Sequence, residues 1–250
     1  MLEAVLLDLD NTLILYDEIE YYHDYFEKIH RSFADIFELD VFKERLVSGT
    51  LALGRSAGEQ SNREQFMAVF ARGHLEKQAN LWQRFMNFYG NGYTEMGVNV
   101  SVPEGLHTGV RRLRQTGLKL VIASNPIFPV LAQQARVCWG GLKPEWFDLY
   151  TSIENMCSVK PRRAYFLQTC SLIGVAPENC LMVGNDPVND MAAAGAGLRT
   201  YRTTDAEVVD YASLTLTDEQ RNNPIRVIPE PDFKGPFSGV ADVVERLMGR

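Results

Sequence analysis

Apolar residues follow two alternating patterns along this chain. Helical spacing of apolar positions covers 104–116, 126–137, 162–173 and 187–196. Pro103, Pro161 and Pro187 stand near the starts of these segments, where the first helical turn tolerates proline. Between them lie short continuous apolar runs, which are typical of buried parallel strands, at Ala4 to Leu7, Leu118 to Ala123, Leu149 to Ile153, Cys180 to Val183 and Leu198 to Tyr201. The alternation predicts an α/β fold, with a parallel sheet joined by right-handed crossovers.

One long interval interrupts this alternation. About 85 residues separate the first run from Pro103, and they contain no strand pattern. Apolar residues recur at helical spacing from Asp17 to Glu38, and a second helical region covers Asn62 to Tyr89. We therefore expect a discontinuous core of residues 1–15 and 101–250, with an all-α domain of residues 16–100 inserted. Because the insertion begins just behind the first strand, it is expected to fold over that strand end as a lid.

The remaining tail is polar. Residues 203–239 contain several prolines and are expected to wrap the surface of the core, and a short helix is expected over Val240 to Met248.

Composition excludes several classes of protein. Hydrophobic content of 46% and charged content of 23% are ordinary for a globular domain. The net charge of -7 argues against a nucleic-acid partner, since phosphate backbones are bound by clustered Lys and Arg. No apolar stretch reaches bilayer length, and the chain enters a strand at once, so we expect a cytoplasmic protein without a membrane partner. The four cysteines lack CxxC spacing, which argues against a zinc site or a disulfide framework. Oligomeric state is not indicated.

Two carboxylates end the first predicted strand. Asp8 and Asp10 follow the run Ala4 to Leu7 and precede Asn11 and Thr12. At positions i and i+2 of an extended chain both side chains point the same way, so a nearby cation is needed to offset their repulsion. Ligands bind beyond the carboxyl ends of strands in open α/β sheets. The alternative is ordinary turn chemistry, since Asp and Asn favour loops.

Polar side chains also follow three later strands. Ser124 and Asn125 follow the second run and could bind a phosphate oxygen, although either could equally cap a helix. Lys160 could neutralise a phosphate or be a surface lysine. Asp186 and Asp190 lie in an acidic loop that could complete a Mg²⁺ site, cap the next helix, or do both. Because parallel strands end on one edge of a sheet, we expect the four sets to converge.

This ordered set of motifs resembles the haloacid dehalogenase superfamily. That family has a DxDxT strand end, a Ser or Thr after the second core strand, a downstream Lys and an acidic loop related to GDxxxxD. The resemblance covers residues 1–15 and 101–203, and the inserted helices are similar to the family's helical, C1-type cap. It implies a Rossmann-like core and a Mg²⁺-dependent phosphatase acting on a small phosphorylated metabolite.

The resemblance also implies roles for individual residues. Asp8 would be the nucleophile that forms an aspartyl-phosphate, and Asp10 the general acid and base. Thr12 would orient the loop. The remaining implied roles are phosphate binding by Ser124, Asn125, Lys160 and Thr12, catalysis assisted by Lys160, and metal binding by Asp8, Asp10, Asp186 and Asp190. Asp10 disfavours a dehalogenase, whose chemistry needs neither metal nor an acid at that position.

One position departs from the family pattern. Asn185 stands where the family commonly has an acid, and Asp186 follows it. We expect Asp186 to bind the metal directly and Asp190 to act through water or through Lys160, although these roles could be exchanged. The departure leaves open a phosphate-binding protein with weak or lost catalysis, and a phosphotransferase or sugar-phosphate mutase also shares the motifs. Side chains expected to face the substrate are Tyr16, His23, Arg55 and Tyr93.

Overall fold

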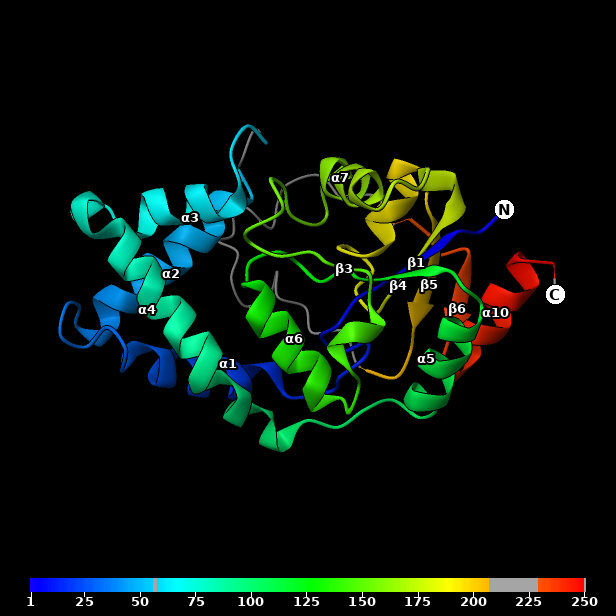
Figure 1. Cartoon of the computed structure of the whole chain (residues 1–250), viewed down its shortest axis with the longest axis horizontal. Coiled ribbons are helices and arrows are strands. Elements are labelled where there is room, and N and C mark those ends of the chain that lie inside the picture. The colour runs from blue at the N-terminus through cyan, green and yellow to red at the C-terminus, as the bar shows by residue number, and fades with distance from the viewer. Residues whose placement is uncertain (56–57, 207–228, 250) are drawn as a thin grey trace.

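The computed structural model describes residues 1–55, 58–206 and 229–249. Its core is a six-stranded, all-parallel sheet with strand order β3-β2-β1-β4-β5-β6 (Figure 1). The predicted α/β, Rossmann-like fold class is therefore confirmed. The strands are β1 Ala4–Leu7, β2 Lys119–Ile122, β3 Leu149–Tyr150, β4 Cys180–Gly184, β5 Arg199–Thr203 and β6 Phe233–Gly235.

Strand β1 lies between β2 and β4 near the centre of the sheet. All four of its side chains are apolar, which suits this position, and all four are buried. Val5 and Leu7 pack on one face with α5 (Leu106–Gln115) and α10 (Val240–Leu247), while Ala4 and Leu6 pack on the other with α7 (Arg163–Ile173). Leu7 pairs with Ile122 of β2 and with Val183 of β4. This register brings the carboxyl ends of the three central strands level, so the polar residues that follow them start from the same edge.

The predicted helices of the core are found with shifted ends, with one exception. Helix α6 spans Val130–Trp139 and lies between the sheet and the inserted helices (Figure 1). The helix expected over 187–196 is wrong: only a 3₁₀ segment, Met191–Ala196, is present. The carboxylate of Asp186 accepts hydrogen bonds from the backbone of Val188 and Asn189, which holds residues 186–189 in a local turn.

Residues 16–100 are helical in the part that the structure describes. The helices are α1 Glu18–His30, α2 Leu39–Leu53, α3 Asn62–Phe70 and α4 Gln78–Asn91, with 3₁₀ segments at Leu75–Lys77 and Tyr93–Asn99. The helical region expected from Asp17 to Glu38 is confirmed as far as His30, where α1 ends. The chain turns after His30, which lets Phe33 pack against Phe42 of α2. These helices lie at the opposite end of the molecule from both termini (Figure 1).

The two chain passages that join the helical insertion to the core meet at one point. Leu15 and Ser101 form an isolated antiparallel bridge with two backbone hydrogen bonds, of 2.8 and 2.9 Å. The insertion is thus connected to the core through two adjacent backbone segments that are hydrogen-bonded to each other.

The C-terminal tail differs in part from its prediction. Residues 207–228 lie outside the described residues, but β6 adds to the sheet edge beside β5, with Tyr201 paired to Phe233. The sequence lacked a signal for this strand because Phe233 is its only large apolar residue. Among the described residues, no helix is long and apolar enough to cross a bilayer.

Candidate active site

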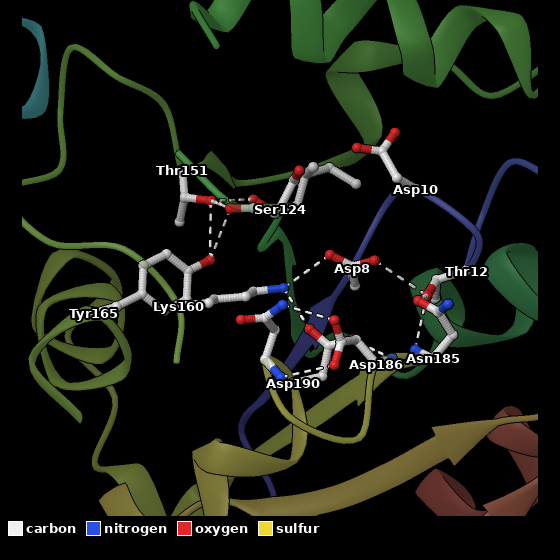
Figure 2. Close-up of polar contacts among 12 residues, drawn as sticks. Asp8, Asp10, Thr12, Ser124, Thr151, Lys160, Tyr165, Asn185, Asp186 and Asp190 are labelled. Atoms are coloured by element: carbon white, nitrogen blue, oxygen red, sulfur yellow. Dashed lines mark hydrogen bonds and ion pairs between the residues drawn. The ribbon is translucent and has the colours of Figure 1, made fainter. Parts of the chain in front are cut away.

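Lys160 connects two of the predicted motifs. Its Nζ donates to Asp8 Oδ1 at 2.8 Å and to Asp190 Oδ1 at 2.6 Å (Figure 2). The Lys160 side chain is only 2% exposed, so this residue is not a surface lysine. The chain brings it there in the loop between β3 and α7, whose helix packs on the same face of the sheet as Leu6. The convergence of distant segments expected from the sequence is therefore present around Asp8.

Thr12 connects the first motif to the acidic loop. Its hydroxyl lies 3.2 Å from Asp8 Oδ2 as a donor and accepts a hydrogen bond from the backbone N–H of Asn185 at 3.1 Å (Figure 2). The turn between Asp8 and Thr12 passes through Asn11 at φ 56°, a left-handed conformation that Asn tolerates better than most residues. Asn185, the departure from the family pattern, thus binds the Asp8 loop.

The two acids of the acidic loop have different environments. Asp186 accepts hydrogen bonds at Oδ1 from Val188 N and Asn189 N, and at Oδ2 from the Asn189 side chain at 2.6 Å. Asp190 Oδ2 accepts from Asp186 N at 3.0 Å, while its Oδ1 binds Lys160. Gly184 makes this packing possible, since a Cβ there would lie 2.1 Å from Asp190 Oδ2. Asp186 caps its own turn, and Asp190 contacts the rest of the site through Lys160.

Ser124 and Asn125 leave the end of β2 and line the same cavity as Asp8. The Ser124 carbonyl accepts hydrogen bonds from the Thr151 hydroxyl at 2.7 Å and the Tyr165 hydroxyl at 3.0 Å, which anchors the loop (Figure 2). The amide oxygen of Asn125 is buried and has no hydrogen-bond partner among the residues that the structure describes. A polar group in this state favours a site that is completed by a ligand.

The site opens into a cavity of about 620 Å³ between the sheet edge and the helical insertion. Every predicted site residue except Thr12 contributes to its wall: Asp8, Asp10, Ser124, Asn125, Lys160, Asp186 and Asp190. The structure therefore brings the predicted residues together in one volume, with Thr12 behind Asp8.

Burial dominates the electrostatics of Asp8, Asp190 and Lys160. It raises the pKa of Asp8 to about 8, with Lys160 opposing the shift and Asp190 and Asp10 adding to it. Burial likewise raises the pKa of Asp190, against the effect of Lys160. Burial by itself lowers the pKa of Lys160, but Asp190 and Asp8 together raise it well above its usual value. One cation faces two buried carboxyl groups, so ionising both leaves an excess of negative charge, which a divalent cation would offset.

The donor set fits a hard cation such as Mg²⁺. The oxygens at the cavity that could bind it include the carboxylates of Asp8 and Asp186 and the amide oxygen of Asn185. The described residues form no group of three or more His, Cys, Asp or Glu that could hold a metal by themselves. Mg²⁺ is commonly bound by one or two carboxylates and completes its shell with water and substrate phosphate. The residues present are sufficient for that kind of site.

Arg136 of α6 contacts the site, although the sequence pattern did not single it out. Its side chain is fully buried, and Nη1 binds Asp10 Oδ2 at 2.8 Å. Nε donates to the Tyr93 hydroxyl at 2.7 Å, Nη2 donates to the Tyr21 hydroxyl at 3.0 Å, and the guanidinium lies 4.0 Å from the ring centroid of Phe128. The available signal was a charged residue within the apolar pattern of the segment 126–137. Buried arginines are usually paired, so an acid partner could have been sought.

The ion pair with Arg136 sets the orientation of Asp10. The Asp10 carboxyl points away from Asp8 (Figure 2), and its second oxygen, Oδ1, is buried with no hydrogen-bond partner in the described part of the chain. One carboxylate oxygen of Asp10 is therefore bound by Arg136 of α6, while the other makes no hydrogen bond to a described group.

The expected substrate-facing residues are corrected by the structure. Tyr16, His23, Arg55 and Tyr93 do not line the cavity. Tyr93 is buried against Arg136, and His23 is exposed on the outer side of α1 beside Glu27. Spacing along a helix did not reveal which face of α1 turns inward, because the face is chosen by packing against α4 and α6.

Glu18 is the acid that α1 contributes to the cavity. Its carboxylate accepts a hydrogen bond from the Asn11 side chain. Burial raises the pKa of Glu18 to about 7; the charge of Asp10 adds to the shift, and the hydrogen bond from Asn11 opposes it.

We expect Glu18→Gln to stabilise the protein at alkaline pH. Because the folded-state pKa of about 7 lies above the unfolded value of about 4.3, protonation of Glu18 favours folding at low pH. That contribution is lost as the pH rises through about 7, and glutamine does not lose it. Urea unfolding with a chelator present measures the difference in free energy of unfolding between the variant and the parent. This difference should shift in favour of the variant by about 1–2 kcal/mol from about pH 4 to pH 8. Glu20→Gln, an exposed change on the same helix, is the control; an equal gain there would contradict the assignment.

Residues 2–197 match the family model of haloacid dehalogenase-like hydrolases. This match covers well over half of the chain, so the protein belongs to the haloacid dehalogenase-like hydrolases. The resemblance inferred from the four strand-end motifs is confirmed, and with it the prediction of a phosphoester hydrolase.

Individual proteins that this chain resembles share only a small part of its sequence. A Clostridium perfringens protein named as a candidate pyrophosphatase, PpaX, is 22% identical over 247 residues, covering 99% of both chains. A phosphoglycolate phosphatase of Chromobacterium violaceum is 31% identical over 133 residues, which are 52% of this chain and 57% of that protein. Among solved structures, the 2-haloacid dehalogenase of Pseudomonas syringae pv. tomato superposes with a TM-score of 0.60 at 16% identity, covering 99% of this chain and all of the other. That last likeness concerns the fold alone.

Proposed function

We propose that this protein is a Mg²⁺-dependent phosphatase that hydrolyses a small phosphorylated metabolite through an aspartyl-phosphate on Asp8. The observation that carries the proposal is the position of the Asp8 carboxylate, which lies at a cavity wall between the ammonium of Lys160 and the hydroxyl of Thr12. The phosphatase names of two relatives support the reaction class.

In the first half-reaction an oxygen of Asp8 attacks phosphorus in line, and the bond from phosphorus to the ester oxygen breaks. Ser124 and Asn125 bind phosphate oxygens, and Lys160 holds Asp8 in place while offsetting the developing charge. Mg²⁺, which Asp8, Asp186 and the main-chain carbonyl of Asp10 would hold, supplies positive charge that lets an anionic nucleophile approach an anionic phosphate.

Asp10 acts as the general acid and then as the general base. It donates a proton to the leaving oxygen and then accepts one from the water that attacks the aspartyl-phosphate, which breaks the bond between phosphorus and Asp8. To reach these atoms, the Asp10 carboxyl has to turn from Arg136 toward Asp8, and its unpartnered oxygen is suited to that task.

We also propose that residues 16–100 form a cap domain on a core of residues 1–15 and 101–250. The paired backbone at Leu15 and Ser101 supports this division, because it leaves a narrow connection between the two parts. The cap would exclude water and other nucleophiles from Asp8 during the reaction.

The test is phosphate release from p-nitrophenyl phosphate. With Mg²⁺ present the protein should turn over this generic ester, and excess chelator should abolish turnover. Asp8→Asn should reduce the rate by about three orders of magnitude or more, because the amide cannot serve as the nucleophile. Full activity in Asp8→Asn would remove this residue from the mechanism.

A phosphate-binding protein without turnover is the second candidate. The observation that favours it is the carboxylate of Asp186, whose two oxygens already accept three hydrogen bonds within its own loop. Titration with Mg²⁺ and inorganic phosphate distinguishes the two candidates: tight phosphate binding without turnover, at any Mg²⁺ concentration, would favour the binding protein.

A further inference from the structure

The charge in the cavity is unevenly distributed. Lys160 is the one basic side chain among the described residues that line it, and this lysine already binds Asp8 and Asp190. The acids at the wall are Asp8, Asp10, Glu18, Asp186 and Asp190. A transferred phosphate would occupy the Lys160 end with the metal. A second anionic group on the substrate would then meet Glu18, and none of the described lining residues would offer it a free cation.

The side of the wall that faces away from Asp8 is mostly apolar. The helical insertion lines the cavity mainly with aromatic and aliphatic side chains, including Tyr22, Phe26, Leu51, Phe66, Trp82 and Tyr89. The core adds Ile127, Phe128 and Ile153 at the loops after β2 and β3. Such a surface gains free energy by burying an apolar group. A polar group placed against its aliphatic and phenyl side chains would lose hydrogen bonds to water without replacing them.

We propose that the substrate is a phosphate monoester of an apolar, aromatic alcohol that carries no second anionic group. This inference rests on the proposed phosphatase function and names its substrate class. The phosphate lies against Asp8, Ser124 and Lys160, and the aromatic part fills the space under α1, α2 and α4. The cavity of about 620 Å³ is of the size that encloses a small organic ligand. Pyrophosphate and phosphoglycolate, the substrates in the relatives' names, both carry a second anion and are expected to be poor substrates here.

The experiment compares four compounds with the full-length protein and Mg²⁺: 2-phenylethyl phosphate, ethyl phosphate, phosphoglycolate and pyrophosphate. Burial of the phenyl ring should give 2-phenylethyl phosphate a kcat/KM that exceeds that of ethyl phosphate by roughly 10- to 100-fold. The kcat/KM for 2-phenylethyl phosphate should exceed that for phosphoglycolate by at least the same factor. Equal values for the two esters of neutral alcohols, or preference for phosphoglycolate or pyrophosphate, would overturn the substrate class while leaving the phosphatase function intact. Hydrolysis of none of the four, nor of p-nitrophenyl phosphate, would instead remove the phosphatase function itself.

A matched pair of variants tests the apolar wall directly. Leu51 lines the cavity and is 61% exposed, whereas Leu75 lies outside it and is 60% exposed. Leu51→Arg adds a cation to the wall, so the ratio of kcat/KM for phosphoglycolate to that for 2-phenylethyl phosphate should rise by about 5-fold or more. Leu75→Arg should leave the ratio unchanged. A ratio unaffected by Leu51→Arg, or raised equally by Leu75→Arg, would contradict the placement of the alcohol part against this wall.

Discussion

Replacement of Lys160 by Met is expected to lower the free energy of unfolding by about 3–5 kcal/mol at slightly alkaline pH in the absence of metal. Lys160 is 2% exposed and binds the carboxylates of Asp8 and Asp190, which are themselves 11% and 2% exposed. Methionine fills a similar volume but provides no charge. Two buried carboxylates would then repel each other without compensation.

The pH dependence identifies the cause of this loss. Burial already raises the pKa of Asp8 to about 8 and raises that of Asp190, so protonation of both favours the folded state. A contribution of this sign is present at low pH and is lost as the pH rises through the folded-state pKa. The destabilisation by Lys160→Met should therefore be smaller at about pH 5 than at about pH 8.5, as measured by urea unfolding at the two values.

Lys28→Met is the matched control for Lys160→Met. Lys28 binds Asp24 at 2.8 Å on the surface of α1, where its side chain is 30% exposed. Exposed pairs of this kind contribute about 0–1 kcal/mol. If Lys160→Met cost no more than Lys28→Met, or cost the same at both pH values, the buried ion pairs would not stabilise the site as described.

Asp10→Asn is expected to cost about 3 kcal/mol of stability as well as most of the activity. The substitution keeps the shape of the side chain but leaves the fully buried guanidinium of Arg136 without a counter-charge. The Tyr21 and Tyr93 hydroxyls still accept its hydrogen bonds, but they carry no charge. The value lies at the lower end of the range for buried pairs because Asp10 itself is 25% exposed.

A double-mutant cycle separates this effect from a general defect. Asp10→Asn combined with Arg136→Met removes both charges, so the double variant should lose less stability than the sum of the two single variants. Thermal unfolding of the four proteins at neutral pH provides the measurement. Additive losses, or an Asp10→Asn variant as stable as its parent, would show that the ion pair has no net effect on folding.

The core elements were predictable because their signals are local. The buried strand Ala4–Leu7 is continuous in apolar residues, and its end is marked by the charged residues Asp8 and Asp10. Strand β6 was missed for the opposite reason: Phe233–Gly235 is stabilised by pairing with β5 at the sheet edge, which leaves no periodic pattern in the sequence. Helix α2 was not assigned its own bounds, although its buried residues Phe42, Leu46 and Leu53 recur at helical spacing.

The sequence by itself determined the fold class, the family and the set of residues around Asp8, because motifs that follow parallel strands must share one edge of the sheet. Only the tertiary structure decided how these residues are connected. The contact of Lys160 with two carboxylates, the pairing of Asp10 with Arg136 and the apolar wall facing Asp8 all join segments that lie far apart in the chain. The physical reason is that burial and charge compensation depend on three-dimensional packing, which residue spacing along one element does not encode.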